Sequence, residues 1–197
     1  MRLIVAMSGG SGAQYGLRLI EVLTSLGHEI DLVVSAGAER VLELEVGDNY
    51  QQILDLTAVQ YDVRDIGAAI ASGTHPNDGM IIVPCSMKTL AAIAHGFSQN
   101  LIHRAADVML KEGRKLVLVN RETPLNRIHL KNMLAAQEAG ATIMPASPGY
   151  YYHPKTVDDL INFMVGKILN VIGINHDVIK AWNPDTAMDE ITKSSTK

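Results

Sequence analysis

Residues 115–124 read Lys-Leu-Val-Leu-Val-Asn-Arg-Glu-Thr-Pro. The first half of this stretch is apolar and β-branched, which is typical of a strand that is buried on both faces of a parallel sheet. The second half is charged and ends in proline, so it predicts the loop that follows the strand. Because open parallel sheets bind ligands beyond the carboxyl ends of their strands, we expect Arg121 and Glu122 to lie at the functional site.

Other apolar runs indicate further strands, and segments with helical periodicity separate most of them. The runs are Leu3–Met7, Ile30–Ser35, Met80–Pro84 and Ala141–Met144, with a short strand possible at Val59–Tyr61. Helices are predicted over Gly12–Ser25, Gly37–Leu44, Ser86–His95, Asn100–Glu112, Arg127–Glu138 and Thr156–Gly173. This alternation predicts an α/β fold, a three-layer sandwich in which helices cover both faces of a mostly parallel sheet of about six strands.

Composition limits the class of protein. The chain has 197 residues, which suits one well-buried domain, and we expect that domain over residues 1–182 with a polar tail over residues 183–197. Apolar residues make up 47%, charged residues 19%, and the net charge is −4, which is typical of a soluble protein and argues against nucleic-acid binding. The first apolar run is too short to span a membrane. A single cysteine fits a reducing compartment, so we expect a cytoplasmic protein with a small-molecule partner.

Two turns rich in small residues follow predicted strands. The first is Met7-Ser-Gly-Gly-Ser-Gly-Ala13, where the backbone can approach a ligand and the next helix directs N–H groups at it, which suits a phosphate. Its spacing is not that of a dinucleotide site, and it lacks the lysine of a P-loop. The second is Cys85–Thr89, with Ser86 placed as a helix N-cap. A tight turn without a ligand and a simple cap remain the structural alternatives.

Several single residues suggest chemistry. Arg104 and Lys111 lie seven residues apart on one predicted helix, so they share a face and can address one anion. The tyrosines at 150–152 follow the last strand, where a hydroxyl can bind an anion or a ring can face a cation. No histidine has ligand spacing with cysteines or acids, so we predict no metal site. Cys85 has no evident base and is interpreted as a small buried residue.

Taken together, the segments resemble the flavin prenyltransferases of the UbiX type. The resemblance covers residues 2 to about 182 and is carried by Ser8–Ala13, Ala71–Gly73, Pro84–Leu90, Asn100–Glu112, Arg121–Pro124, Ile128–Met133 and Pro148–Tyr151. It implies a Rossmann-like flavoprotein fold, with FMN bound between the subunits of a homododecamer. It also implies that a dimethylallyl group passes from dimethylallyl monophosphate to N5 and C6 of reduced FMN. The product, prenylated FMN, would serve UbiD-type decarboxylases.

The resemblance assigns roles by position. The residues expected to contact FMN are Gly9, Gly10, Ser11, Ser35, Ser86, Met87, Lys88, Thr89 and Arg121. The residues expected to bind the prenyl donor are Arg104, Lys111, Glu122, Tyr151, Lys167 and Trp182, the last as a possible aromatic face for the allyl cation. Glu45, Lys111 and Glu122 are the expected catalytic residues.

Two positions depart from the family pattern. Gly10 stands where the family usually has alanine, which removes one methyl group and should be tolerated. Lys167 stands where some relatives have arginine, which gives a point charge in place of a planar fork, so phosphate binding should persist with altered geometry.

Two other functions remain as alternatives. FMN-dependent cysteine decarboxylases share this architecture, but they usually show Pro-Ala-Ser-Ala-Asn-Thr where this chain has Pro84-Cys-Ser-Met-Lys-Thr89, together with a catalytic histidine and a cysteine motif that are absent here. The non-catalytic alternative is an FMN-binding accessory subunit of a decarboxylase. The apolar segment Leu90–Ala94 fits either an oligomer contact or a buried helix face.

Overall fold

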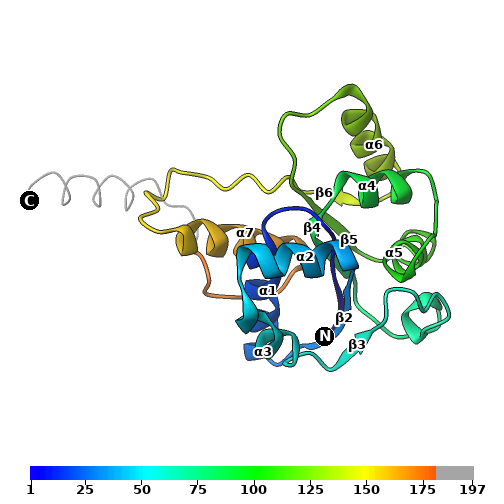
Figure 1. Cartoon of the computed structure of the whole chain (residues 1–197), viewed down its shortest axis with the longest axis horizontal. Helices are drawn as coiled ribbons and strands as arrows, with labels where there is room; N and C mark the ends of the chain where they lie inside the picture. Colours follow the sequence, from blue (N-terminus) through cyan, green and yellow to red (C-terminus); the bar gives the residue numbers. More distant parts are fainter. Residues whose placement is uncertain (181–197) are drawn as a thin grey trace, which may run out of the picture. The chain divides into compact units, whose positions relative to one another are not determined.

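The structure is a computed structural model that describes residues 1–180. It divides into two compact units, the first over Met1–Ala146 and the second beginning at Ser147 (Figure 1). Within the described residues, the first unit holds six parallel strands in the order β3-β2-β1-β4-β5-β6. The strands are β1 (Arg2–Met7), β2 (Glu29–Val34), β3 (Val59–Tyr61), β4 (Met80–Cys85), β5 (Leu116–Asn120) and β6 (Thr142–Ile143). The predicted α/β fold is confirmed.

The strand order locates the crevice of the sheet. The chain adds β2 and β3 on one side of β1, and then adds β4, β5 and β6 on the other side. Connections leave β1 and β4 in opposite directions, so their carboxyl ends flank a switch point, which is where sheets of this order bind ligands. The turns after Met7 and after Cys85 both lie there.

The helices match their predicted spans to within one residue at each end. In the first unit they are α1 (Ala13–Ser25), α2 (Ala36–Glu45), α4 (Met87–Ala94), α5 (Leu101–Lys111) and α6 (Arg127–Glu138). The sequence did not predict the four-residue helix α3 (Gln51–Leu54) or the 3₁₀ turns at Asp48–Tyr50 and Ala69–Ala71, because such short elements carry no readable period.

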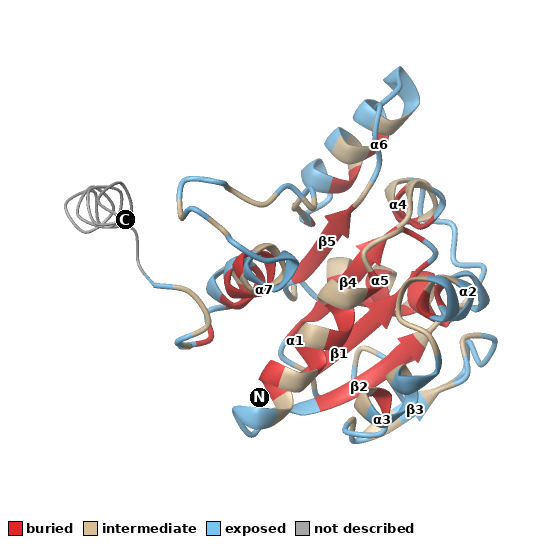
Figure 2. Cartoon of the chain, turned by 60° about the vertical axis from the view of Figure 1, so that its left-hand side comes forward, coloured by how far each residue is buried: buried red, intermediate tan, exposed pale blue. Residues whose placement is uncertain are grey.

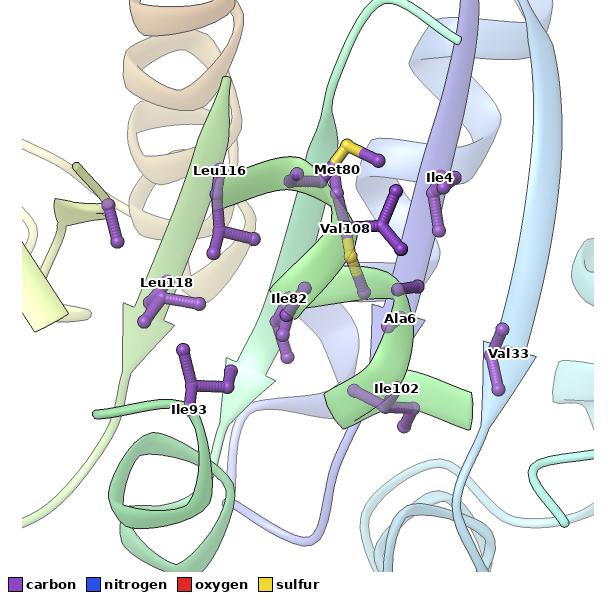
Figure 3. Close-up of a cluster of buried hydrophobic side chains, with 14 of the residues drawn as sticks. Ile4, Ala6, Val33, Met80, Ile82, Ile93, Ile102, Val108, Leu116 and Leu118 are labelled. Atoms are coloured by element: carbon purple, nitrogen blue, oxygen red, sulfur yellow. The ribbon is translucent and has the colours of Figure 1, made fainter. Parts of the chain in front are cut away.

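The sheet is buried on both faces. Strands β1, β4 and β5 are almost wholly buried in Figure 2. On one face, alternate strand residues pack against α4 and α5, as Figure 3 shows for Ile82 and Leu118 beside Ile93, and for Ala6 beside Ile102. On the other face lies α1, whose Gly16 touches Met7 and Val83 so closely that a Cβ there would clash. This two-sided packing explains why the strands read as continuous apolar runs.

The second unit contains α7 (Val157–Ile172). Thr156 and Asp159 form a capping box at its start, and Gly173 ends it in the left-handed conformation, with φ of 87°. The rings of Tyr151, Tyr152 and Phe163 cluster, with centroids 4.6 Å apart for the two tyrosines and 5.1 Å apart for Tyr152 and Phe163.

Two sequence expectations receive no test. Trp182 and the predicted tail over residues 183–197 lie outside the described residues, so the domain boundary stays a prediction. Among the helices of the described residues, none combines the length and apolarity needed to cross a bilayer.

Candidate functional site

Ser8 joins the two turns at the switch point. Its hydroxyl donates to the carbonyl oxygen of Pro84 at 3.1 Å and accepts from the backbone N–H of Ser86 at 2.8 Å. Its own N–H donates to the same carbonyl at 3.1 Å, and the residue is only 2% exposed. The carboxyl ends of β1 and β4 are therefore held together by a buried side chain that the sequence analysis did not single out.

We expect Ser8→Ala to lower the free energy of unfolding by about 1–3 kcal/mol, because it leaves the half-buried Ser86 N–H without its acceptor. Urea denaturation of the flavin-free protein measures this loss. Ser25→Ala is a matched control, since the Ser25 hydroxyl only bonds a carbonyl of its own helix end. A Ser8→Ala loss no larger than that of the control would contradict this role.

The glycine turn after β1 runs close to neighbouring backbone. A Cβ at Gly9 would lie 3.3 Å from the backbone of Gly37, and a Cβ at Gly10 would lie 3.4 Å from the Cβ of Pro84. The second distance is an ordinary contact, so the space at Gly10 agrees with the expectation that an alanine and a glycine are interchangeable there. Gly12 differs, because its φ is 103° and a Cβ would lie 2.8 Å from the Tyr15 ring.

Alanine substitutions at Gly12 and Gly10 should have different effects on stability. Gly12→Ala is expected to lower the free energy of unfolding by about 1–2 kcal/mol, because L-residues are strained in the left-handed region. Gly10→Ala serves as the control and should leave stability unchanged or raise it by up to about 1 kcal/mol, since its backbone is compatible with alanine. Thermal unfolding of both variants checks this, and equal losses would contradict it.

Glu45 is the last residue of α2, and its side chain reaches the start of α1. Its carboxylate accepts the N–H of Gly12 at 2.9 Å and the N–H of Ala13 at 2.9 Å. Burial raises the pKa of Glu45, but hydrogen bonds from Ser11, Ala13 and Gly12 and the charge of Arg121 outweigh burial and hold its pKa below the usual value. The glycine-rich turn predicted that these N–H groups would be free to bind a phosphate. In the structure a carboxylate holds them, so an anion would have to displace it.

The serines predicted to contact FMN cap the neighbouring helices. The Ser86 hydroxyl accepts from the N–H of Thr89 at 3.3 Å at the start of α4, as predicted. The Ser35 hydroxyl accepts from the N–H of Ala38 at 3.2 Å at the start of α2. Both caps stand at carboxyl ends of strands, β4 and β2, so the helix starts point their positive ends toward the same edge of the sheet.

Arg121 and Glu122 stand at the end of β5, as predicted. The Arg121 Nε is buried and has no hydrogen-bond partner, while its charge acts on Glu45. Glu122 is exposed, and its carboxylate accepts from the N–H of Thr123 at 3.0 Å. The structure thus brings Arg121 near Glu45 and leaves one guanidinium N–H unpaired.

The two cations of α5 are paired with acids and lie two turns apart along the helix. Arg104 bonds Asp107 at 2.6 Å, and Lys111 pairs with Glu112. The N–H of Leu101 donates to Val63, just beyond the end of β3, so α5 begins at the carboxyl edge of the sheet. It ends seven residues after Arg104, about 10 Å along the axis, at the opposite edge. Within one chain, Lys111 therefore lies on the far edge from Glu122.

The remaining predicted site residues differ in their exposure to solvent. Tyr151 and Lys167 belong to the second unit, and both are exposed. Met87 is half-buried and Lys88 is exposed in the first turn of α4. Burial raises the pKa of the Cys85 thiol to about 12, which favours the interpretation of Cys85 as an unreactive buried residue. Among residues 1–180, no cluster of three histidine, cysteine or acidic side chains could hold a metal ion.

Comparison with known proteins identifies the family. The sequence profile of the Flavoprotein family matches residues 1–169. The chain belongs to the Flavoprotein family. Among curated proteins of this kind, the flavin prenyltransferase UbiX of Deinococcus radiodurans is 49% identical over 94% of this chain and 95% of its own length. The resemblance stated from the sequence is confirmed.

Solved structures agree with this family assignment. A crystal structure of AnUbiX (PadA1) in complex with FMN and dimethylallyl pyrophosphate is 44% identical, with a TM-score of 0.90 over 92% of this chain and 97% of that one. A dodecameric FMN-dependent UbiX-like decarboxylase from Escherichia coli O157:H7 is also 44% identical, with a TM-score of 0.90 over 93% of this chain and all of that one.

Proposed function

We propose that this protein is a flavin prenyltransferase, which transfers a dimethylallyl group from dimethylallyl monophosphate to N5 and C6 of reduced FMN. The observation that carries the proposal is the meeting of the Ser8–Ala13 turn, the Ser86 cap and Arg121 at one edge of the sheet. It occurs in a chain that is 49% identical to a flavin prenyltransferase over nearly its whole length.

The residues at this edge fit FMN. Gly9 and Gly10 present backbone without side chains, while Ser11, Ser35 and Ser86 offer hydroxyls. The buried Arg121 Nε lacks a partner, and a flavin or phosphate oxygen would satisfy it. Met87, Lys88 and Thr89 complete the proposed set from the first turn of α4. Reduced FMN supplies the electron-rich N5 and C6 that accept the dimethylallyl group.

The chain's own residues assist departure of the phosphate. When the allylic carbon–oxygen bond breaks, its electron pair leaves with the phosphate, and preorganised cations lower that barrier without a metal ion. Arg104, Lys111 and Lys167 are the proposed cations, and Tyr151 and Trp182 shelter the allyl cation with their rings. Glu45 and Glu122 take up the proton that the flavin releases, so the flavin gains C5H8 in total and the proton ends on the phosphate.

We propose that this site is shared between copies of the chain. Lys111 and Glu122 stand at opposite edges of the sheet in one chain, so one phosphate contacts both only if they come from different copies. The dodecameric state of a relative that is 44% identical supports a homododecamer here. Prenylated FMN then passes to UbiD-type decarboxylases in the cytoplasm, as the family resemblance implies.

Mass spectrometry of the flavin tests the function. The protein is incubated without oxygen with reduced FMN and dimethylallyl monophosphate, and the released flavin is expected to gain one C5H8 unit. Unchanged flavin that stays bound would favour an accessory subunit of a decarboxylase. Oxidative decarboxylation of a peptidyl or pantothenoyl cysteine by the same preparation would favour a cysteine decarboxylase.

A further inference from the structure

Arg114 forms hydrogen bonds with a distant loop, residues 73–78, through both terminal nitrogens of its guanidinium. One terminal nitrogen donates to the carbonyl oxygen of Gly73 at 2.6 Å, and the other donates to the carbonyl oxygen of His75 at 2.9 Å. The two carbonyls precede Arg114 by 41 and 39 residues. The guanidinium is half-buried, so these charge-assisted bonds are partly shielded from water.

The start of this loop, at Gly73, lies against the side chain of Lys111. A Cβ added at Gly73 would be 2.9 Å from the Lys111 Nζ and would overlap the carboxylate of Glu112. The φ of Gly73 is not in the left-handed region, and the atoms that a Cβ would meet are the ends of two exposed side chains, so a methyl group there would displace Lys111 and Glu112 rather than strain the backbone. The backbone at Gly73 therefore lies directly beside the Lys111 ammonium.

Other contacts anchor the end of the loop beside β1 and β2. Asp78 exchanges two hydrogen bonds with the backbone of Arg2, each 2.8 Å long. His75 Nε2 lies 3.2 Å from the carboxylate of Asp31, a fully buried residue on β2. Arg114 follows the end of α5 by three residues, and its two hydrogen bonds tie the loop to that end of the helix, where Lys111 lies.

We propose that Arg114 is a positioning residue for the prenyl donor. By holding the carbonyls of Gly73 and His75, it fixes the backbone against which the Lys111 ammonium is placed for the donor phosphate. A lysine at position 114 would supply a point donor and could not hold two carbonyls in this fork geometry. This inference rests on the proposed function, in which Lys111 binds that phosphate.

Direct binding measurements test it. Calorimetry follows dimethylallyl monophosphate binding to the full-length protein loaded with oxidised FMN, in which transfer does not proceed. Arg114→Met keeps the aliphatic stem and is expected to raise the donor Kd about tenfold, since two charge-assisted bonds are lost. The FMN Kd should be unchanged, because neither Arg114 nor the loop that it holds belongs to the residues proposed to contact FMN. Arg114→Lys should restore part of the donor affinity.

The Lys111→Ala background gives the decisive comparison. If Arg114 acts through Lys111, Arg114→Met in that background should change the donor Kd less than twofold. Gly73→Ala leaves Arg114 intact but adds a methyl group that would displace the Lys111 ammonium, so it too should weaken donor binding in the native background. This variant keeps the test available if Arg114→Met does not fold.

The outcomes separate the inference from the function. An unchanged donor Kd in both Arg114→Met and Gly73→Ala, or an equal loss with and without Lys111, would overturn the positioning role. Wild-type protein that binds the donor but never enlarges the flavin would refute the transferase and leave this role standing. Wild-type protein that binds no donor would refute both.

Discussion

Glu122→Gln and Glu45→Gln are each expected to keep FMN bound while turnover falls by roughly 10²- to 10⁴-fold. The amide has nearly the shape of the carboxylate, but it cannot take up the proton that the flavin releases. Glu122 is exposed and engaged only by the neighbouring Thr123 N–H among the bonds described, so its loss should leave the fold intact. Product formation under saturating donor, together with FMN titration, measures the two effects separately.

Glu45 has a second role that its variant should reveal. Because its carboxylate caps α1 and its pKa is held below the usual value, it stabilises the fold above the ordinary glutamate pKa. That contribution is lost as pH falls through the lowered pKa of the folded state. Glu45→Gln should therefore also lower the free energy of unfolding at neutral pH. The free energy of unfolding of this variant should fall less steeply than that of the wild type as the pH is lowered.

Glu43→Gln is the matched control, since Glu43 lies on the same helix but pairs with Arg40 at the surface. It should leave turnover and FMN binding unchanged. Turnover at the wild-type rate in both Glu45→Gln and Glu122→Gln would refute the proposed proton transfer.

Two inactive variants are expected to regain activity when they share one oligomer. Lys111→Ala and Glu122→Gln damage opposite edges of the sheet, which meet at one phosphate only between copies. When equal amounts assemble at random, about a quarter of the sites receive an intact Lys111 from one copy and an intact Glu122 from another. Co-expression with two different affinity tags isolates the mixed oligomers for a product assay.

The control for this experiment joins both substitutions in one chain. Co-expressing the double variant with either single variant leaves no site with both residues intact, so activity should stay at background. Mixed single variants that also stay at background would contradict a site shared between copies.

The sequence predicted the sheet because its strands are buried on both faces. Residues 115–124 located both the strand β5 and the loop that carries Arg121 and Glu122. Helix ends were also readable, since Ser86 and Asn100 stand as caps directly before α4 and α5. These signals are local, so they can be read from the sequence without knowledge of the tertiary structure.

Long-range contacts could not be read in this way. Ser8 bonds residues 76 and 78 positions later, and Glu45 caps a helix that begins 32 residues earlier. Nothing in the local pattern of either segment specifies those partners. The spacing of Arg104 and Lys111 predicted that they share one face of a helix. It did not predict that they lie toward opposite edges of the sheet, which follows because a helix between parallel strands runs from one edge of the sheet to the other.

In the proposed site, basic and acidic side chains from different copies meet at one donor phosphate beside FMN. The most direct measurement is an experimental structure of the assembled oligomer with FMN and dimethylallyl monophosphate bound. We expect Lys111 of one copy and Glu122 of another within about 3.5 Å of the same phosphate. A structure in which Arg104, Lys111 and Glu122 face separate cavities, with every copy of the oligomer included, would rule out a shared phosphate site.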